Sequence, residues 1–162
     1  MSSFETLDVG CGNNPRGDVN VDCFPNRRDQ CVIGWDTKKV RNFVLADCEY
    51  LPFQDAVFKK IFAIHVLEHL KNPPQALKEW KRVGEIVVIR VPSAYDLDQT
   101  KTHIYTWNQA TLTNLLDKIF ENVRVFYTSK RIHFRGRLTK YIPFLRLLVN
   151  RFPAEIRAVC WS

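Results

Sequence analysis

Short apolar runs recur along the chain, and several of them end at an acidic residue. The run at 60–65 is apolar at nearly every position, which is typical of a strand buried on both faces of a parallel sheet. The run at 122–128 alternates like a surface strand, and the run at 85–92 stops at Pro92. The pattern predicts strands over residues 4–9, 19–22, 42–47, 60–65, 85–92, 122–128 and 155–161.

Two further segments have apolar residues at helical spacing. The segment 73–83 begins with two prolines and carries an apolar face made of Leu77, Trp80 and Val83. The segment 107–120 has the same spacing, and Thr106 before it is a candidate N-cap. Strands that alternate with helices predict one α/β domain over residues 1–162, with a mostly parallel sheet.

Composition indicates the cellular compartment in which this domain is expected. The N-terminal sequence has no basic stretch followed by an apolar core, so we expect no signal peptide. No apolar run reaches the length of about 18 residues that a membrane span requires. The five cysteines are odd in number, irregularly spaced and without a Cys-x-x-Cys pair. We therefore expect reduced thiols in a cytoplasmic protein.

The formal net charge of +7 is concentrated toward the C-terminal end. Residues 130–157 hold eight basic residues and one acidic residue, and the rest of the chain is balanced. Within this basic segment, residues 130–153 mix arginine and lysine with aromatic and aliphatic residues and predict an amphipathic insertion between the last two strands. Three roles remain open for it: cover for a sheet edge, contact with a membrane surface, and contact with nucleic acid.

The stretch LDVGCGNNPRGDVNVD (7–22) carries a Gly-x-Gly turn between two predicted strands. A dinucleotide site needs a third glycine where this chain has Pro15, and an acidic residue about 20 positions further on. Here Asp22 follows Gly12 by only ten residues, and no Gly-Lys-Ser/Thr of a phosphate loop is present. The turn therefore suits a nucleoside without phosphates, with Asp22 accepting ribose hydroxyls and Asp47 accepting an exocyclic amino group. The residues at carboxyl ends of predicted strands, where ligands of such sheets bind, are Asp8, Gly10, Gly12, Asp22, Asp47 and His65.

Six motifs occur along the chain in the order LDVGCG, NVD, ADCEYLPF, HVLEHL, RVP and HIYTWNQATLTNLL. Over roughly residues 4–120, this set resembles the class I S-adenosylmethionine-dependent methyltransferases, in particular the small type 11 family. The resemblance implies a Rossmann-like α/β sheet, mostly parallel with an antiparallel last strand, and S-adenosyl-L-methionine as the cofactor. It also implies a set of cofactor-binding residues: Asp8, Gly10, Cys11, Gly12, Asp22, Asp47, Cys48, Leu51 and His65.

The same resemblance assigns individual roles. Asp8 would lie near the methionine ammonium, Asp22 would hold the ribose, and Asp47 would meet the adenine amino group in a pocket lined by Cys48 and Leu51. His65 would flank the methionine end of the cofactor. The chain departs from the family pattern in its first crossover, where about nine residues replace a helix and a tight turn is expected. The N-terminal helices that often cover the cofactor are expected to be absent.

Methyl transfer requires a nucleophile aligned with the methyl group, and a general base helps when that nucleophile is a hydroxyl or an ammonium. His65 and His103 are the candidate catalytic bases. His103 lies in the loop where the family places substrate-facing residues, and Tyr105 and Trp107 would line the same pocket, with ordinary packing as the alternative. We predict transfer to a small-molecule or lipid-linked acceptor, with RNA or protein as the alternative.

A rival interpretation comes from HVLEH (65–69), which matches the His-x-x-Glu-His of one metalloprotease group. On a helix, His65 and His69 would ligate zinc, and Glu68 would act as the general base. However, His65 follows a predicted buried strand and no third ligand is evident downstream. Glu68 and His69 are therefore interpreted as residues at the start of a helix, and no metal site is predicted. A zinc hydrolase and a non-catalytic S-adenosylmethionine-binding module remain as alternatives.

Overall fold

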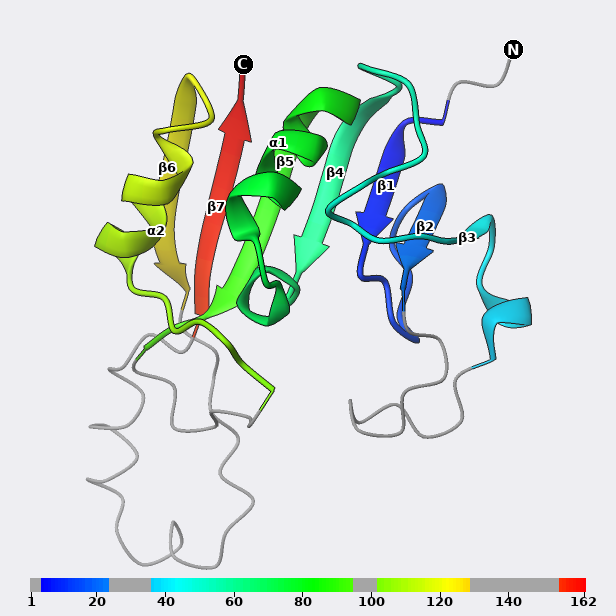
Figure 1. The fold of residues 1–162 in the computed structure, drawn as a ribbon, viewed down its shortest axis with the longest axis horizontal. Helices are drawn as coiled ribbons and strands as arrows, with labels where there is room; N and C mark the ends of the chain where they lie inside the picture. Colours follow the sequence, from blue (N-terminus) through cyan, green and yellow to red (C-terminus); the bar gives the residue numbers. More distant parts are fainter. Residues whose placement is uncertain (1–3, 24–35, 95–101, 129–154) are drawn as a thin grey trace, which may run out of the picture.

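The computed structural model describes residues 4–23, 36–94, 102–128 and 155–162. Its centre is one seven-stranded sheet with the strand order β3-β2-β1-β4-β5-β7-β6 (Figure 1). The strands are β1 (Thr6–Val9), β2 (Val19–Asp22), β3 (Phe43–Leu45), β4 (Phe58–Ile64), β5 (Gly84–Pro92), β6 (Asn122–Thr128) and β7 (Glu155–Trp161). All seven overlap the runs that the sequence predicts as strands.

The sheet is parallel except at β7, which pairs antiparallel with both β5 and β6. The order reverses at β1 and β4, which lie side by side while their connections lead to opposite edges of the sheet. This arrangement confirms the predicted mostly parallel sheet with an antiparallel last strand. It also confirms the short first crossover, because residues 10–18 form turns and bends without a helix.

The apolar core lies on one face of the sheet. Two helices, α1 (Pro73–Val83) and α2 (Gln109–Leu116), pack on that face, α1 over β4 and β5 and α2 over β6 (Figure 1). Side chains in register across the strands are buried beneath them, among them Leu7, Val9, Ile61, Ala63, Val87, Ile89 and Ala158. On the other face, Phe62, Ile64 and Val88 are partly exposed in the described part of the chain. The expectation that β4 is buried on both faces is therefore wrong.

Helix α1 is bounded tightly at both ends. The Asn72 side chain caps it by accepting a hydrogen bond from the backbone of Gln75, and Pro73 occupies the first turn. The helix ends at Val83, and β5 begins at the next residue, Gly84. A Cβ at Gly84 would lie 2.5 Å from Cγ1 of Ile61, so only glycine allows the new strand to lie this close to β4.

Helix α2 begins later than its apolar spacing predicts. Asn108 and Thr111 form a reciprocal capping box, in which each side chain accepts a hydrogen bond from the other residue's backbone N–H. The expected N-cap at Thr106 is therefore wrong, and the helix covers residues 109–116 rather than 107–120. The predicted insertion at 130–153 lies outside the described residues, as does the basic segment 130–157 except for its last three residues. No helix in the described ranges has the length and apolarity needed to cross a membrane.

Candidate functional site

The turn after β1 is built on two glycines in left-handed conformation, Gly10 with φ 66° and Gly12 with φ 52°. A Cβ at Gly10 would lie 2.5 Å from Cγ2 of Val66, so the turn presses against the end of β4 there. A Cβ at Gly12 would meet no atom within 4 Å. The backbone N–H of Cys11 donates to the carbonyl of Val21 at 3.0 Å and holds the turn onto β2. Gly10 thus lets the turn pack closely on Val66, and Gly12 leaves the turn open to a ligand on its Cβ side.

Asp22 ends β2 and faces this turn. Its Oδ2 accepts a hydrogen bond from the backbone N–H of Gly12 at 3.1 Å. Its carbonyl oxygen accepts from the N–H of Ala46 at 3.3 Å, which brings the residue before Asp47 next to Asp22. The structure therefore places the backbone of Asp22 beside the residue that precedes Asp47.

Asp8 is buried within β1 and has an unusual electrostatic state. Burial raises the pKa of its carboxyl group to about 6 from an ordinary value of 3.8, although the hydrogen bond from the backbone N–H of Arg16 opposes this rise. That bond to Oδ2 is 2.8 Å long, whereas Oδ1 has no hydrogen-bond partner among the described residues. A buried carboxylate with an unsatisfied oxygen is suited to receive a cationic group.

The connection from β3 to β4 contains the other predicted contacts. Asp47 is exposed, and its Oδ1 accepts from the N–H of Glu49 at 2.9 Å, while Cys48 and Leu51 are buried. Burial raises the pKa of the Cys48 thiol above its usual range and that of the Cys11 thiol to about 12. Both thiols are therefore neutral and act as small packing groups. No disulfide bond joins the cysteines in the described ranges.

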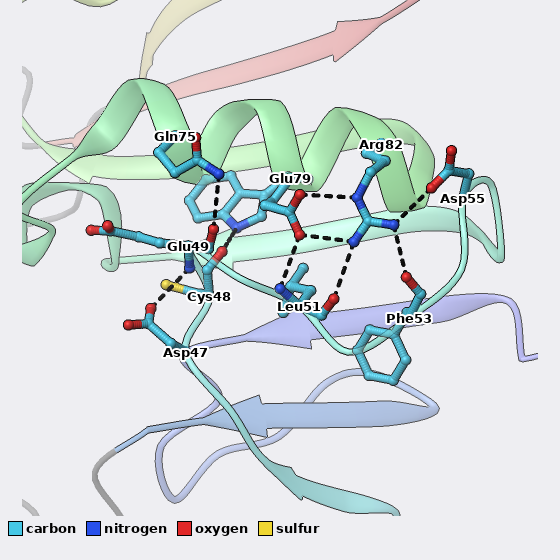
Figure 2. Close-up of polar contacts among 10 residues, drawn as sticks. Asp47, Cys48, Glu49, Leu51, Phe53, Asp55, Gln75, Glu79 and Arg82 are labelled. Atoms are coloured by element: carbon cyan, nitrogen blue, oxygen red, sulfur yellow. Dashed lines mark hydrogen bonds and ion pairs between the residues drawn. The ribbon is translucent and has the colours of Figure 1, made fainter.

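Side chains of α1 form a clamp on this connection (Figure 2). The Arg82 guanidinium donates to the backbone carbonyls of Leu51 at 3.1 Å and Phe53 at 2.8 Å. It also pairs with Asp55 at 2.7 Å and makes two bonds to Glu79, whose second oxygen accepts from the N–H of Leu51. The hydrogen bond from Arg82 holds the pKa of Glu79 below its ordinary value. This clamp fixes the loop that holds the predicted adenine wall.

Trp80 and Gln75 extend the clamp toward the N-terminal part of α1. The indole N–H of Trp80 donates to the carbonyl of Cys48 at 3.1 Å, and the Gln75 amide donates to the carbonyl of Glu49 at 3.2 Å (Figure 2). Four residues of one helix thereby hold the main chain between Cys48 and Phe53. The sequence analysis missed Glu79 and Arg82, whose (i, i+3) spacing is the signal that was present.

A cluster of histidines and buried glutamates lies beyond β4. His65 has a φ of 57°, and its Nε2 lies 3.0 Å from Oε1 of Glu155 on β7. Its Nδ1 lies 3.4 Å from Oε1 of Glu68, whose side chain is 0% exposed. Glu155, which is also buried, has Arg90 and Arg157 within 4 Å. The candidate base His65 is therefore held between two carboxylates.

His103 belongs to the same cluster. The backbone N–H groups of Ile104 and Tyr105 donate to the carbonyl of Glu68 at 2.8 and 3.2 Å, which ties the loop after β5 to residues 67–69. The rings of His69 and His103 meet edge to face, with centroids 4.8 Å apart. The two histidines predicted separately as bases thus share one neighbour, Glu68. Their catalytic role stays a prediction.

Two of the alternatives left open for this region do not hold. Trp107 packs in the core instead of lining a pocket, and the partly exposed Tyr105 stacks on it. The segment HVLEH does not form the helix that a metalloprotease needs, because His65 has left-handed backbone and only Leu67–His69 form a single 3-10 turn. Glu68 consequently lies between the two histidines and not beside a zinc ion held by them.

Comparisons with known proteins agree with this geometry. The family model Methyltransf_11, a methyltransferase domain, matches residues 19–85. Sterol 4-C-methyltransferase strm-1 of Caenorhabditis elegans is 27% identical over 118 residues, which cover 61% of this chain and 34% of that protein. The chain therefore spans about a third of the length of this curated relative.

Solved structures match over nearly the whole chain. A SAM-dependent methyltransferase from Archaeoglobus fulgidus has a TM-score of 0.67 at 18% identity and covers 99% of this chain and 87% of its own. The plantazolicin methyltransferase BpumL, in complex with SAH, has a TM-score of 0.65 at 14% identity, with 98% and 76% covered. These likenesses establish the fold, and the family model and the sequence relative point the same way. By fold, the chain is similar to S-adenosylmethionine-dependent methyltransferases of known structure, and its residues 19–85 match the methyltransferase-domain model.

Proposed function

We propose that this protein transfers a methyl group from S-adenosyl-L-methionine to a small-molecule or lipid-linked acceptor. The observation that carries the proposal is the turn between Asp8 and Asp22, in which Gly10 packs on Val66 while Gly12 is open on its Cβ side. A nucleoside bound across this turn would meet carboxylates at both ends. The absence of a third glycine and of a phosphate-loop lysine supports a ligand without phosphates.

The residues then divide the work of binding. Asp22 would accept from the ribose hydroxyls, and Asp47, one residue after the Ala46 amide that donates to the Asp22 carbonyl, would accept from the adenine amino group. Cys48 and Leu51 would form the apolar wall against the adenine ring, in a loop that Arg82 keeps in place. Asp8 would pair with the methionine ammonium, and this pairing would favour its ionised form.

The acceptor side, in this proposal, is the histidine cluster at the end of β4, which adjoins the glycine turn through Val66. The reaction needs no covalent enzyme intermediate. The acceptor attacks the methyl carbon, the carbon–sulfur bond breaks, and its electron pair stays on the sulfur of S-adenosylhomocysteine. The protein's task is alignment, exclusion of water and removal of the acceptor's proton, and in this proposal His65 and His103 are the bases that would accept it. The sterol 4-C-methyltransferase among the relatives supports a small-molecule acceptor as the first class to test.

Calorimetric titration with S-adenosylmethionine and S-adenosylhomocysteine tests the cofactor site. We expect micromolar binding to the wild type and a loss of at least tenfold in Asp22→Asn, because one carboxylate accepting from two hydroxyls is a strong recognition element (about 1.4 kcal/mol per tenfold). Glu85→Gln is the matched control, since Glu85 is an exposed carboxylate at the opposite end of the sheet. Equal affinity in Asp22→Asn and Glu85→Gln, or no binding to the wild type, would remove the proposal.

A further inference from the structure

Within the described part of the chain, Glu68 is a buried carboxylate that lacks the hydrogen bonds by which buried carboxylates are usually stabilised. Its side chain is 0% exposed, and neither oxygen has a hydrogen-bond partner among the described residues. Two imidazole nitrogens lie near Oε1, Nδ1 of His65 at 3.4 Å and Nε2 of His69 at 4.0 Å. A buried carboxylate is costly unless it is paired or coordinates a metal ion.

The imidazole of His69 is oriented toward this carboxylate. Its Nδ1 lies 3.1 Å from the carbonyl oxygen of Thr102. Because a carbonyl can only accept, Nδ1 must carry the hydrogen, and in the neutral ring Nε2 then carries the lone pair. A carbonyl that fixes the tautomer of a histidine in this way is the usual partner of a metal-ligating imidazole.

His103 brings a third donor to the same place. One ligand atom each from Glu68, His69 and His103 lie within 4.8 Å of one another. Ligand atoms around a tetrahedral ion with bonds of about 2.1 Å are about 3.4 Å apart. Side-chain rotations that move the three ligand atoms by about 1 Å would therefore bring them to that spacing. The two backbone hydrogen bonds to the carbonyl of Glu68 hold the loop of His103 in position for this.

We propose that Glu68, His69 and His103 form a binding site for one divalent transition-metal ion of the zinc class. Two imidazoles and a carboxylate favour Zn²⁺, Co²⁺ or Fe²⁺ over Mg²⁺, which takes oxygen ligands. Three protein ligands leave at least one coordination position for an oxygen atom from outside the chain. The sequence predicts no metal site, and its His-x-x-Glu-His alternative uses a different set, with His65 and His69 as ligands and Glu68 as base.

The site deepens the proposed function and rests on it for its role. It lies directly after Val66, against which the glycine turn of the proposed cofactor site is packed. An ion here would offer its open position to an oxygen of the acceptor and lower the pKa of a bound hydroxyl. His103 would then act as a ligand, because its lone pair would be on the metal and unavailable for a proton. The acceptor class that fits is a hydroxyl compound.

The site is tested with chelator-treated protein and zinc alone. We expect calorimetry and elemental analysis to give one Zn²⁺ per chain in the wild type, and an affinity at least about 100-fold lower in His103→Ala, since even partners of ligands contribute 10- to 100-fold. Cys23→Ser controls for zinc on an accessible thiol and should bind as the wild type does. Zinc should raise the melting temperature of the wild type and leave that of His103→Ala unchanged.

A spectroscopic measurement separates ligation from a structural effect. Co²⁺ in place of zinc should give visible absorption bands in the wild type that acetohydroxamate shifts, because that probe occupies an open position. Substoichiometric zinc, or equal zinc affinity in the wild type and His103→Ala, would overturn the proposal. Titration of the same protein with S-adenosylmethionine keeps the two proposals apart: zinc binding without cofactor binding would leave the metal site standing and remove the methyltransferase.

Discussion

Replacing Arg82 by methionine tests whether the clamp on α1 maintains the cofactor loop. Methionine keeps the apolar stem of the side chain but removes every donor of the guanidinium. The substitution deletes the hydrogen bonds to the carbonyls of Leu51 and Phe53 and leaves Glu79 without its cation. Since Glu79 is 16% exposed, its carboxylate is then only partly rehydrated.

The contacts of Arg82 allow the size of the effect to be worked out. The side chain is 31% exposed, so each hydrogen bond from its charged group to a loop carbonyl is taken at the low end, about 1.5 kcal/mol. Two such bonds give about 3 kcal/mol. Asp55 is 78% exposed, and its pair with Arg82 adds only about 0.5 kcal/mol. We therefore expect at least about 3.5 kcal/mol for Arg82→Met and about 0.5 kcal/mol for Asp55→Asn.

Urea unfolding measures the loss of stability, and hydrogen exchange at the Leu51 amide measures the loop itself. That amide donates to Oε2 of Glu79 at 3.0 Å and should exchange faster in Arg82→Met but not in Asp55→Asn. Affinity for S-adenosylmethionine should fall in parallel, because the predicted adenine wall lies in this loop. An Arg82→Met protein that matches Asp55→Asn in unfolding, exchange and affinity would refute the reasoning.

Two other parts of the site give separate tests. Because burial raises the pKa of Asp8 from 3.8 to about 6, the folded state holds this proton more tightly than the unfolded chain, and stability falls by about 3 kcal/mol as pH rises from about 4 to above 6. Urea unfolding across this range should lose that component in Asp8→Asn, and an unaltered profile would argue against it. In the wild type, calorimetry should find weaker S-adenosylmethionine binding below about pH 6, where Asp8 is protonated. Gly10→Ala should cost at least about 2 kcal/mol, because φ is 66° and the new Cβ would lie 2.5 Å from Val66. Val66→Ala should recover part of that cost, and the same cost with and without Val66→Ala would contradict the packing explanation.

The sheet and one half of the site were predictable because their signals are local. A continuous apolar run that ends in a polar residue marks both a buried strand and the position of its carboxyl end, which is how Asp8 and Asp22 were found. The left-handed turn was also predictable from a local signal, the two glycines Gly10 and Gly12. Helix α1 followed from its prolines and apolar spacing, and all its predicted core positions are buried.

The other half depends on contacts between distant segments, which no local pattern reports. Glu155 reaches His65 across ninety positions because β7 is inserted beside β5, and its sequence context shows only a strand residue. Glu79 and Arg82 resemble an exposed ion pair on a helix surface until the loop from Leu51 to Asp55 is folded against them. The start of α2 was missed because a reciprocal cap at Asn108 and Thr111 outweighs the apolar spacing that begins earlier.

The direct passage from α1 into β5 fixes the length of the chain at that point. Val83 ends the helix and Gly84 begins the strand, so no loop residue connects them. One added residue would move the strand by one position and turn Val87 and its in-register companions away from the helices. A change of chain length at this junction would therefore have to be absorbed by the helix or by the strand itself, because no loop residue lies between them.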